Sequence, residues 1–169
     1  MRKMLLILLI LALVPTQATF AASPKPAPAK ISARTAYELV YLVELEKLAR
    51  DIYNYLYLHN KKLVKYKEIA ISEQEHMNMV RVALKAKGIK DQSTKLKPGQ
   101  YSFRTLTEYY NRFISHYDPK IPYSVGVEVE AEDMNAIDSV KIVVVEKDVL
   151  KLLNTLEAQS NLHLKYFNK

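Results

Sequence analysis

The chain has 169 residues, no cysteine and a formal net charge of +7. This length suits one domain with a sizeable core, and the lack of cysteine excludes disulfides, thiolate ligands and a lipoprotein anchor. Four of the 25 basic residues precede residue 31 and no acidic residue does, so residues 31–169 carry only +3. No nucleic-acid motif accompanies the remaining lysines, so we expect no nucleic-acid partner.

The first 30 residues have the pattern of an export signal followed by a tether. Two basic residues precede an apolar run and then small residues, so we expect residues 1–22 to be a signal peptide. The apolar run is short for a transmembrane helix, and an uncleaved N-terminal anchor is the alternative. Proline and alanine in residues 23–30 predict a stiff tether before the domain at residues 31–169. We therefore expect a secreted, periplasmic or cell-surface protein without a membrane span after signal cleavage.

The first helix is expected at about residues 35–59, with an apolar stripe centred on Leu45. Glu44 and Glu46 lie about 100° to either side of that centre, so the spacing aims neither carboxylate directly inward. Both remain candidate metal ligands, because another rotamer or a slight roll of the helix would bring one of them into the interior.

Glu73 and His76 form a Glu-x-x-His pair on the second predicted helix. Residues three apart share one helix face, and apolar residues otherwise occupy this face: Ile69, Ala70, Met77, Val80 and Leu84. Because an unpaired buried charge is costly, the pair needs a partner, and a metal ion suits both groups. A buried hydrogen bond between Glu73 and His76 is the alternative.

A long connection with its own short helix follows Gly88, which is a good helix stop. Pro98 and Gly99 predict a turn, and residues 105–117 predict the short helix. The region is rich in aromatic residues: Tyr101, Phe103, Tyr109, Tyr110, Phe113, Tyr117 and Tyr123. We expect these rings to pack over one end of the domain. A lid over a pocket and a contact in a homo-oligomer are the alternatives.

Residues 125–137 predict a second acidic helix that presents Glu130 and Asp133 on one side, as a counterpart to the Glu-x-x-His pair. A solvated, charged surface is the alternative. Residues 140–145 have strong strand propensity but lie between predicted helices, so we interpret them as the final connection or as a helix end.

The last helix, expected at about residues 148–167, places His163 on its inward face. A single inward histidine is often a hydrogen-bonded core residue. Here it would meet two other inward polar pairs, so His163 is also a candidate ligand.

Four segments together resemble the ferritin-like family catalogued as domain of unknown function 2202: residues 44–53, 72–77, 125–134 and 160–167. The resemblance implies an all-α, ferritin-like four-helix bundle, a fold that holds metals between facing helices. The short extra helix would lie in the long connection between the second and third bundle helices. The chain departs from the family at Leu45, where a central glutamate is usual. Ser160 stands where better-known ferritin-like proteins repeat Glu-x-x-His.

The inward polar positions that match the family are Glu73, His76, Glu130, Asp133 and His163. Carboxylate and imidazole ligands suit iron, manganese and zinc. We therefore expect an exported protein that binds one or two such ions, with iron preferred. Fold analogy adds oxidase or peroxide chemistry, with Tyr41 or Tyr53 as an electron donor. The alternative is a secreted structural or interaction module with a metal-free buried polar network.

Overall fold

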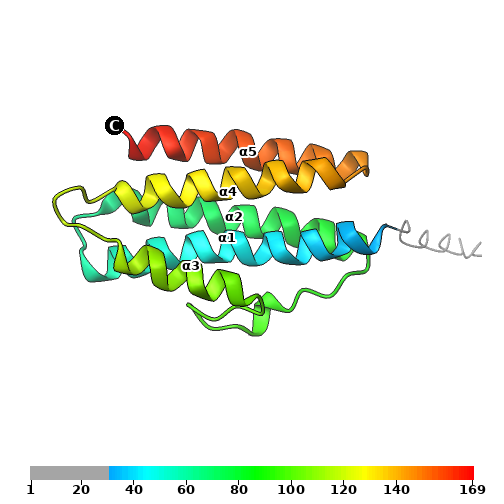
Figure 1. Ribbon diagram of the computed structural model, residues 1–169, viewed down its shortest axis with the longest axis horizontal. Helices are drawn as coiled ribbons and strands as arrows, with labels where there is room; N and C mark the ends of the chain where they lie inside the picture. The colour runs from blue at the N-terminus through cyan, green and yellow to red at the C-terminus, as the bar shows by residue number, and fades with distance from the viewer. Residues whose placement is uncertain (1–30) are drawn as a thin grey trace, which may run out of the picture.

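The computed structural model describes residues 31–169, so the expected signal peptide and tether lie outside the described residues. The elements are α1 (Ala33–His59), α2 (Val64–Ala86), the 3-10 turn η1 (Ser93–Lys95), α3 (Arg104–Ser115), α4 (Ser124–Val143) and α5 (Lys147–Phe167). The four long helices lie lengthwise beside one another, and α3 lies outside them (Figure 1). This confirms the predicted all-α bundle with a short helix between its second and third long helices. None of the helices in residues 31–169 has the length and hydropathy of a membrane span.

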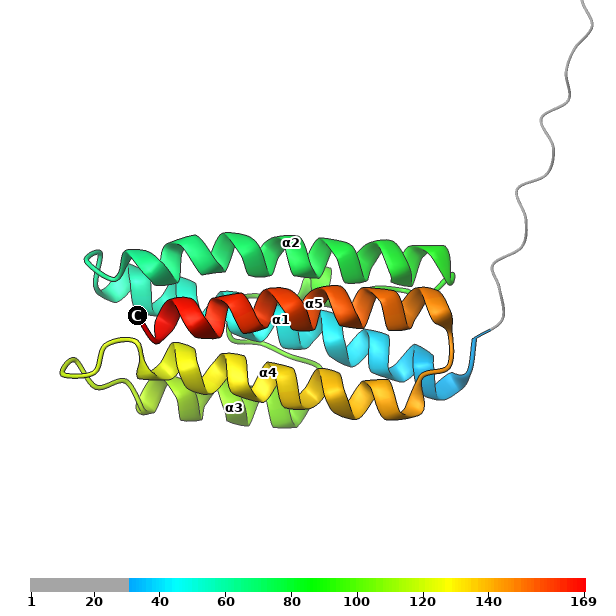
Figure 2. The ribbon, with the colours of Figure 1, turned by 90° about the horizontal axis from the view of Figure 1, so that it is seen from above.

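The long helices form a closed four-membered arrangement (Figure 2). The short turns after α1 and α4 pair α1 with α2 and α4 with α5, while α1 also packs on α4 and α2 on α5. The expected final connection begins later than residue 140, because α4 continues to Val143 and only residues 144–146 link it to α5. The strand propensity of residues 140–145 is therefore overridden by helix packing, as one of the two interpretations anticipated.

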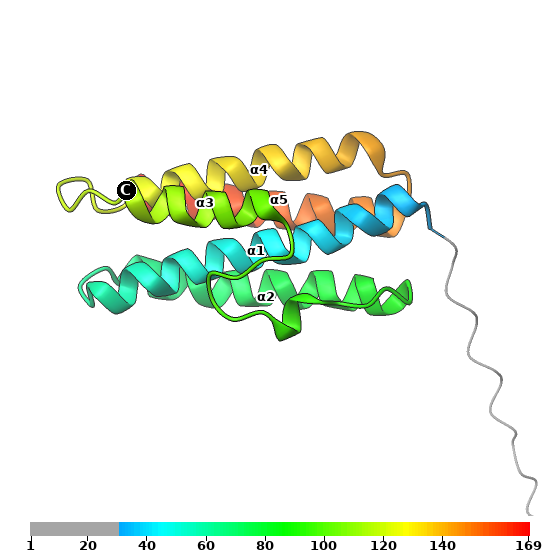
Figure 3. The same cartoon turned by 60° about the horizontal axis from the view of Figure 1, so that its bottom comes forward.

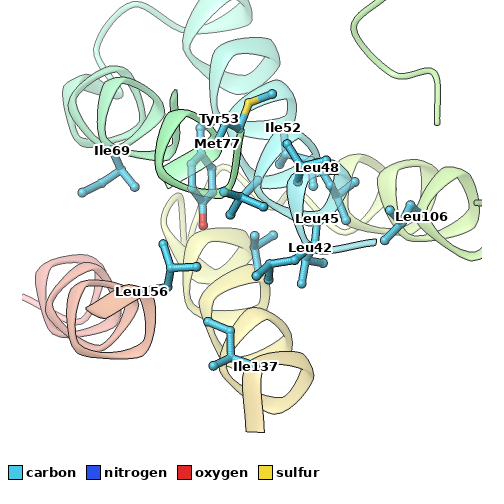
Figure 4. Packing of buried hydrophobic residues seen from close by; sticks show 14 of the residues in the cluster. Leu42, Leu45, Leu48, Ile52, Tyr53, Ile69, Met77, Leu106, Ile137 and Leu156 are labelled. Atoms are coloured by element: carbon cyan, nitrogen blue, oxygen red, sulfur yellow. The ribbon is translucent and has the colours of Figure 1, made fainter. Parts of the chain in front are cut away.

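Helix α1 is buried on nearly every side along its central turns, instead of on the single stripe that the sequence predicted. Residues 42–49 are all buried. The reason is that α2 and α4 cover one side of α1, while α3 and the connection after α2 cover the other (Figure 3). Figure 4 shows Leu106 extending from α3 towards α1, with Ile69, Ile137 and Leu156 contributed by the other helices. Polar side chains on opposite faces of α1 can therefore both be buried.

A buried ion pair fastens the connection after α2 to the outer side of α1. Lys47 Nζ lies 2.5 Å from Asp51 Oδ2 and donates to the carbonyl oxygens of Lys97 at 2.8 Å and Gln100 at 3.1 Å. Asp51 Oδ2 also accepts from Gly99 N at 3.1 Å, and the φ of +76° at Gly99 suits glycine at this turn. The predicted Pro98–Gly99 turn is thus held by hydrogen bonds to α1.

The aromatic residues of the connection pack against the bundle, as expected, but several of them lie along its side instead of over its end. Phe103 makes edge-on contacts with the rings of Tyr37 and Tyr41 on α1. Leu106 and Phe113 of α3, which packs on α1 and α4, are also buried. These contacts explain why so much of α1 is inaccessible to water.

Candidate metal centre

Every long helix contributes a carboxylate or an imidazole to one buried cluster. The members are Glu46 on α1, Glu73 and His76 on α2, Glu130 and Asp133 on α4, and His163 on α5. All six residues are at most 7% exposed. The inward orientation predicted for the pairs on α2 and α4 and for His163 is therefore confirmed by their burial.

Glu73 lies between the two histidines. Its Oε2 is 2.9 Å from His76 Nδ1, and its Oε1 is 2.8 Å from His163 Nδ1. The two imidazole rings are nearly parallel, with centroids 5.2 Å apart. One donor atom from each of Glu73, His76 and His163 can be chosen so that all three lie within 4.8 Å of one another. Donor atoms that share an ion at about 2.1 Å are separated by roughly 3 to 4 Å, so the 4.8 Å limit places these three groups near that spacing and small side-chain movements would be needed to reach it.

Helix α1 supplies Glu46 to the cluster and directs Glu44 elsewhere. Glu46 Oε2 accepts a hydrogen bond of 3.1 Å from His76 Nδ1. Glu44 is equally buried, but its carboxylate accepts hydrogen bonds from the backbone N–H and the hydroxyl of Ser102 in the outer connection. The expectation that either glutamate could serve is corrected to Glu46 alone, because the two side chains lie on different faces of a helix that is covered on both.

Hydroxyl groups around the cluster fix the orientation of several members. Ser160 Oγ donates to Asp133 Oδ2 at 2.7 Å, so the serine that departs from Glu-x-x-His orients a carboxylate. Ser72 Oγ lies 2.8 Å from His163 Nε2, and the other ring nitrogen, Nδ1, lies 2.8 Å from Glu73 Oε1. Apart from its position next to Glu73, no feature of the sequence pointed to Ser72.

The two tyrosines considered as electron donors differ in position. Tyr53 is fully buried, and its hydroxyl donates a 2.7 Å hydrogen bond to Glu130 Oε1. Tyr41 is only partly buried and lines a surface pocket with Tyr109 and Glu132. Tyr53 is therefore the one of the pair that contacts the cluster.

Unpartnered polar atoms concentrate in this cluster. Among residues 31–169, the buried side-chain atoms without a hydrogen-bond partner are Glu46 Oε1, Glu73 Oε1, His76 Nε2, Asp133 Oδ1 and His163 Nδ1. The last of these lies close to Glu73 Oε1, but the two atoms do not have the directions of a hydrogen bond. Buried polar groups are ordinarily paired, and each one left unpaired costs free energy. These five atoms are therefore the least satisfied polar groups in the described part of the core.

The cluster has strongly perturbed acid–base properties. Burial by itself lowers the pKa of His76, but hydrogen bonds with Glu46 and Glu73 outweigh it and raise the pKa to about 11. Glu73 shows the opposite balance, because burial raises its pKa while the two histidines lower it to about 2. Burial and the charge of Glu73 raise the pKa of Glu130 to about 8 and of Asp133 to about 6. Without a cation, protons therefore partly compensate the charge of the carboxylates.

The sequence profile of one protein family, described as "Uncharacterized protein domain (DUF2202)", matches residues 35–169. The chain belongs to this family. The match includes all six members of the cluster and confirms the family resemblance seen in the four sequence segments.

Two comparisons give proteins named MJ0754. The crystal structure of hypothetical protein MJ0754 from Methanococcus jannaschii superposes with a TM-score of 0.78 and 29% identity, over 87% of this chain and 83% of that chain. The uncharacterized protein MJ0754 of Methanocaldococcus jannaschii is 36% identical over 101 residues. That alignment spans 59% of this chain and about half, 54%, of the relative. These names state no activity.

Proposed function

We propose that this protein binds one or two transition-metal ions, preferentially iron, in the buried cluster of the bundle. The observation that carries the proposal is the set of five buried, unpartnered donor atoms on Glu46, Glu73, His76, Asp133 and His163. A cation is the partner that can satisfy carboxylate oxygens and imidazole nitrogens together. The mixed oxygen and nitrogen donors suit iron, manganese or zinc.

Glu73 would help to hold the metal on both sides of the cluster, because each of its oxygens faces a different imidazole. Glu130 stands near His163, at 3.5 Å from its Nδ1, and Glu46 bonds to His76. The candidate metal-binding side chains thus form two neighbouring sets around Glu73. Glu46 takes the place of the central glutamate that the family usually has at position 45, where this chain has leucine. A redox-active ion in this ferritin-like arrangement would supply oxidase or peroxide-related chemistry.

The leader supports a proposal about location. Residues 1–22 have the composition of an export signal, so we propose that the folded domain works outside the cytoplasm. The metal would then be acquired during or after export.

The competing function is a secreted structural or interaction module with a metal-free polar network. The direct contacts of Glu73 and Glu46 with the histidines favour it, because protonated imidazoles can pair with carboxylates without any metal. The metal-free network accounts for the contact between Glu73 Oε1 and His163 Nδ1 but leaves Glu46 Oε1, His76 Nε2 and Asp133 Oδ1 without a hydrogen-bond partner, which is why we prefer the metal.

The test is the metal content of purified protein, measured by elemental analysis after loading with ferrous, manganous or zinc ions and gel filtration. Glu46→Gln and Glu44→Gln form a matched pair, since both glutamates are fully buried on α1 and both substitutions are isosteric. We expect the wild type and Glu44→Gln to retain metal and Glu46→Gln to bind less of it. A wild-type protein that retains none of these ions would refute the proposal in favour of the metal-free module.

A further inference from the structure

The link between α4 and α5 exposes apolar side chains at one end of the bundle. Ile142 is 84% exposed and Val145 79%, the two highest values among the large apolar side chains of residues 31–169. Val143 is exposed as well, whereas Val144 is buried and holds the link against the core. Single exposed apolar side chains are normal on protein surfaces, but several of them grouped at a protruding end mark a candidate interaction site.

The folded domain is attached to the expected leader at this same end. The backbone N–H of Ser32 donates to Glu146 Oε1 at 3.3 Å, and the hydroxyl of Thr35 donates to Glu146 Oε2 at 2.8 Å. The start of α1 therefore lies against the link between α4 and α5, and both are at one end of the bundle (Figure 1, Figure 2). A bilayer that holds the apolar residues 4–14 of the leader thus meets this end of the domain first.

Basic residues surround the exposed apolar side chains. The helix ends and links here contain seven basic and two acidic residues, counted over residues 31–36, 83–90 and 140–151. Both acidic side chains are engaged, Glu146 in the contacts given above and Asp148 with Lys87 Nζ at 2.6 Å. Lys90 and Lys147 are exposed. Apolar side chains together with a net positive charge suit a bilayer with anionic headgroups.

The opposite end of the bundle is also basic, so charge alone does not select one end. It contains seven basic residues and one acidic residue, counted over residues 56–67, 115–124 and 164–169. Its exposed apolar side chains belong to three separate segments, with Leu58 in α1, Val64 in α2 and Ile121 in the connection before α4. The grouped apolar side chains and the attachment of the leader therefore favour the end at which α4 and α5 are joined.

We propose that this end is a membrane-contacting surface, which binds a bilayer with anionic headgroups and inserts Ile142 and Val145 among the acyl chains. A second copy of the chain is the other occupant that an apolar end could take. A stable protein interface uses about 20 to 30 residues on each side, whereas adsorption to a bilayer needs only a few apolar side chains and several basic ones. The surface is separate from the buried cluster, so the inference goes beyond metal binding and is tested without it.

Co-sedimentation with vesicles of phosphatidylcholine and phosphatidylglycerol tests this surface. The protein is the chain from residue 23 onward, the form expected after signal cleavage, so that the leader contributes no binding. We expect binding to these vesicles, and binding at least about tenfold weaker to vesicles of phosphatidylcholine alone. Ile142→Ser combined with Val145→Ser should weaken binding at least about tenfold, because two inserted apolar side chains are lost. The control is Leu58→Ser combined with Ile121→Ser, which should change binding by less than about twofold.

A second measurement uses the absence of tryptophan from the chain. Ile142→Trp places a single indole at the proposed contact, and Leu58→Trp places one at the opposite end. Vesicles with phosphatidylglycerol should shift the emission of Ile142→Trp to shorter wavelength and leave that of Leu58→Trp unchanged. Both side chains are exposed, so we expect each variant to keep the melting temperature of the unaltered chain.

Three results would overturn the inference. The first is an unaltered chain that does not bind vesicles with phosphatidylglycerol. The second is equal binding by the unaltered chain and the Ile142→Ser, Val145→Ser variant, and loss of binding in the Leu58→Ser, Ile121→Ser control would assign the contact to the opposite end. The third comes from analytical ultracentrifugation without vesicles, where a dimer that dissociates in the Ile142→Ser, Val145→Ser variant would show that a second copy covers this surface.

Discussion

Replacement of Gly126 by alanine should destabilise this protein, although alanine normally favours a helix. Gly126 lies in the first turn of α4, opposite the ring of Phe167 at the end of α5. A Cβ atom at this position would lie 2.7 to 2.8 Å from three atoms of that ring. Such contacts are well inside van der Waals separation, so the ring or the helix must move.

The magnitude follows from two opposing effects. Alanine in place of glycine stabilises a helix by at most about 1 kcal/mol. Forcing an extra methyl group into a packed core costs about 1 to 3 kcal/mol. If the Phe167 ring turned out into water instead, the lost burial would cost about 1.5 to 3 kcal/mol. By either route we expect Gly126→Ala to lower the free energy of unfolding by about 1 kcal/mol.

Urea denaturation of four proteins measures this effect: the wild type, Gly126→Ala, Phe167→Ala and the double variant. In the Phe167→Ala background the obstructing ring is gone, so Gly126→Ala should become neutral or stabilising by up to about 1 kcal/mol. A stabilising effect of Gly126→Ala in the wild-type background would refute the packing argument.

Three further predictions concern the metal, the pH and the buried ion pair of Lys47 with Asp51. A chelator should lower the melting temperature of metal-loaded wild type, since a ligand at 100 times its dissociation constant adds about 2.7 kcal/mol to the free energy of unfolding. An unchanged thermal melt after verified metal removal would contradict metal binding. Metal-free protein should lose stability as the pH rises from about 5 to about 9. Folding raises the pKa of Glu130 from 4.5 to about 8 and the pKa of His163 from 6.5 to about 9. In this range the folded state therefore holds more protons than the unfolded state, and a rising pH favours unfolding. Urea midpoints across that range measure this change, and a rising midpoint would count against it. Lys47→Met, which breaks the buried pair with Asp51, should lower the free energy of unfolding by about 3 kcal/mol. Lys141→Met, which breaks a more exposed pair with Glu157, should lower it by less than about 1 kcal/mol. Equal costs in urea titrations would show that burial of the pair is irrelevant.

Helical periodicity was sufficient to orient the polar residues of α2, α4 and α5. These helices each have one buried face, so the apolar neighbours of Glu73, Glu130 and His163 indicated which way the polar groups point. The same reasoning could not choose between Glu44 and Glu46, because α1 is covered by different elements on its two sides. Nothing within residues 33–59 reveals that the distant Ser102 would accommodate Glu44.

The hydroxyl groups around the cluster illustrate a second limit. Ser160 was visible in the sequence only as a departure from a repeated motif, yet its hydroxyl donates a hydrogen bond to Asp133 in the cluster. Ser72 bonds to His163 across 91 positions of the chain. Such pairings depend on the relative rotation of two helices, which composition and spacing do not specify.

The enclosure of α1 also determines how the protein opens. Along its central turns, residues 42–49, the helix cannot be exposed to water without separating it from α2 and α4 or from α3 and the outer connection. The backbone amides around Glu46 should therefore exchange with deuterium only when the whole domain unfolds, and their exchange rate should report the global free energy of unfolding. Glu44 and Glu46 are two residues apart on this rigid helix, one bonded to the outer connection and the other to the buried cluster. If the cluster binds a metal, its occupancy should thus be reflected in the deuterium uptake of residues 97–102, far along the chain from most residues of the cluster.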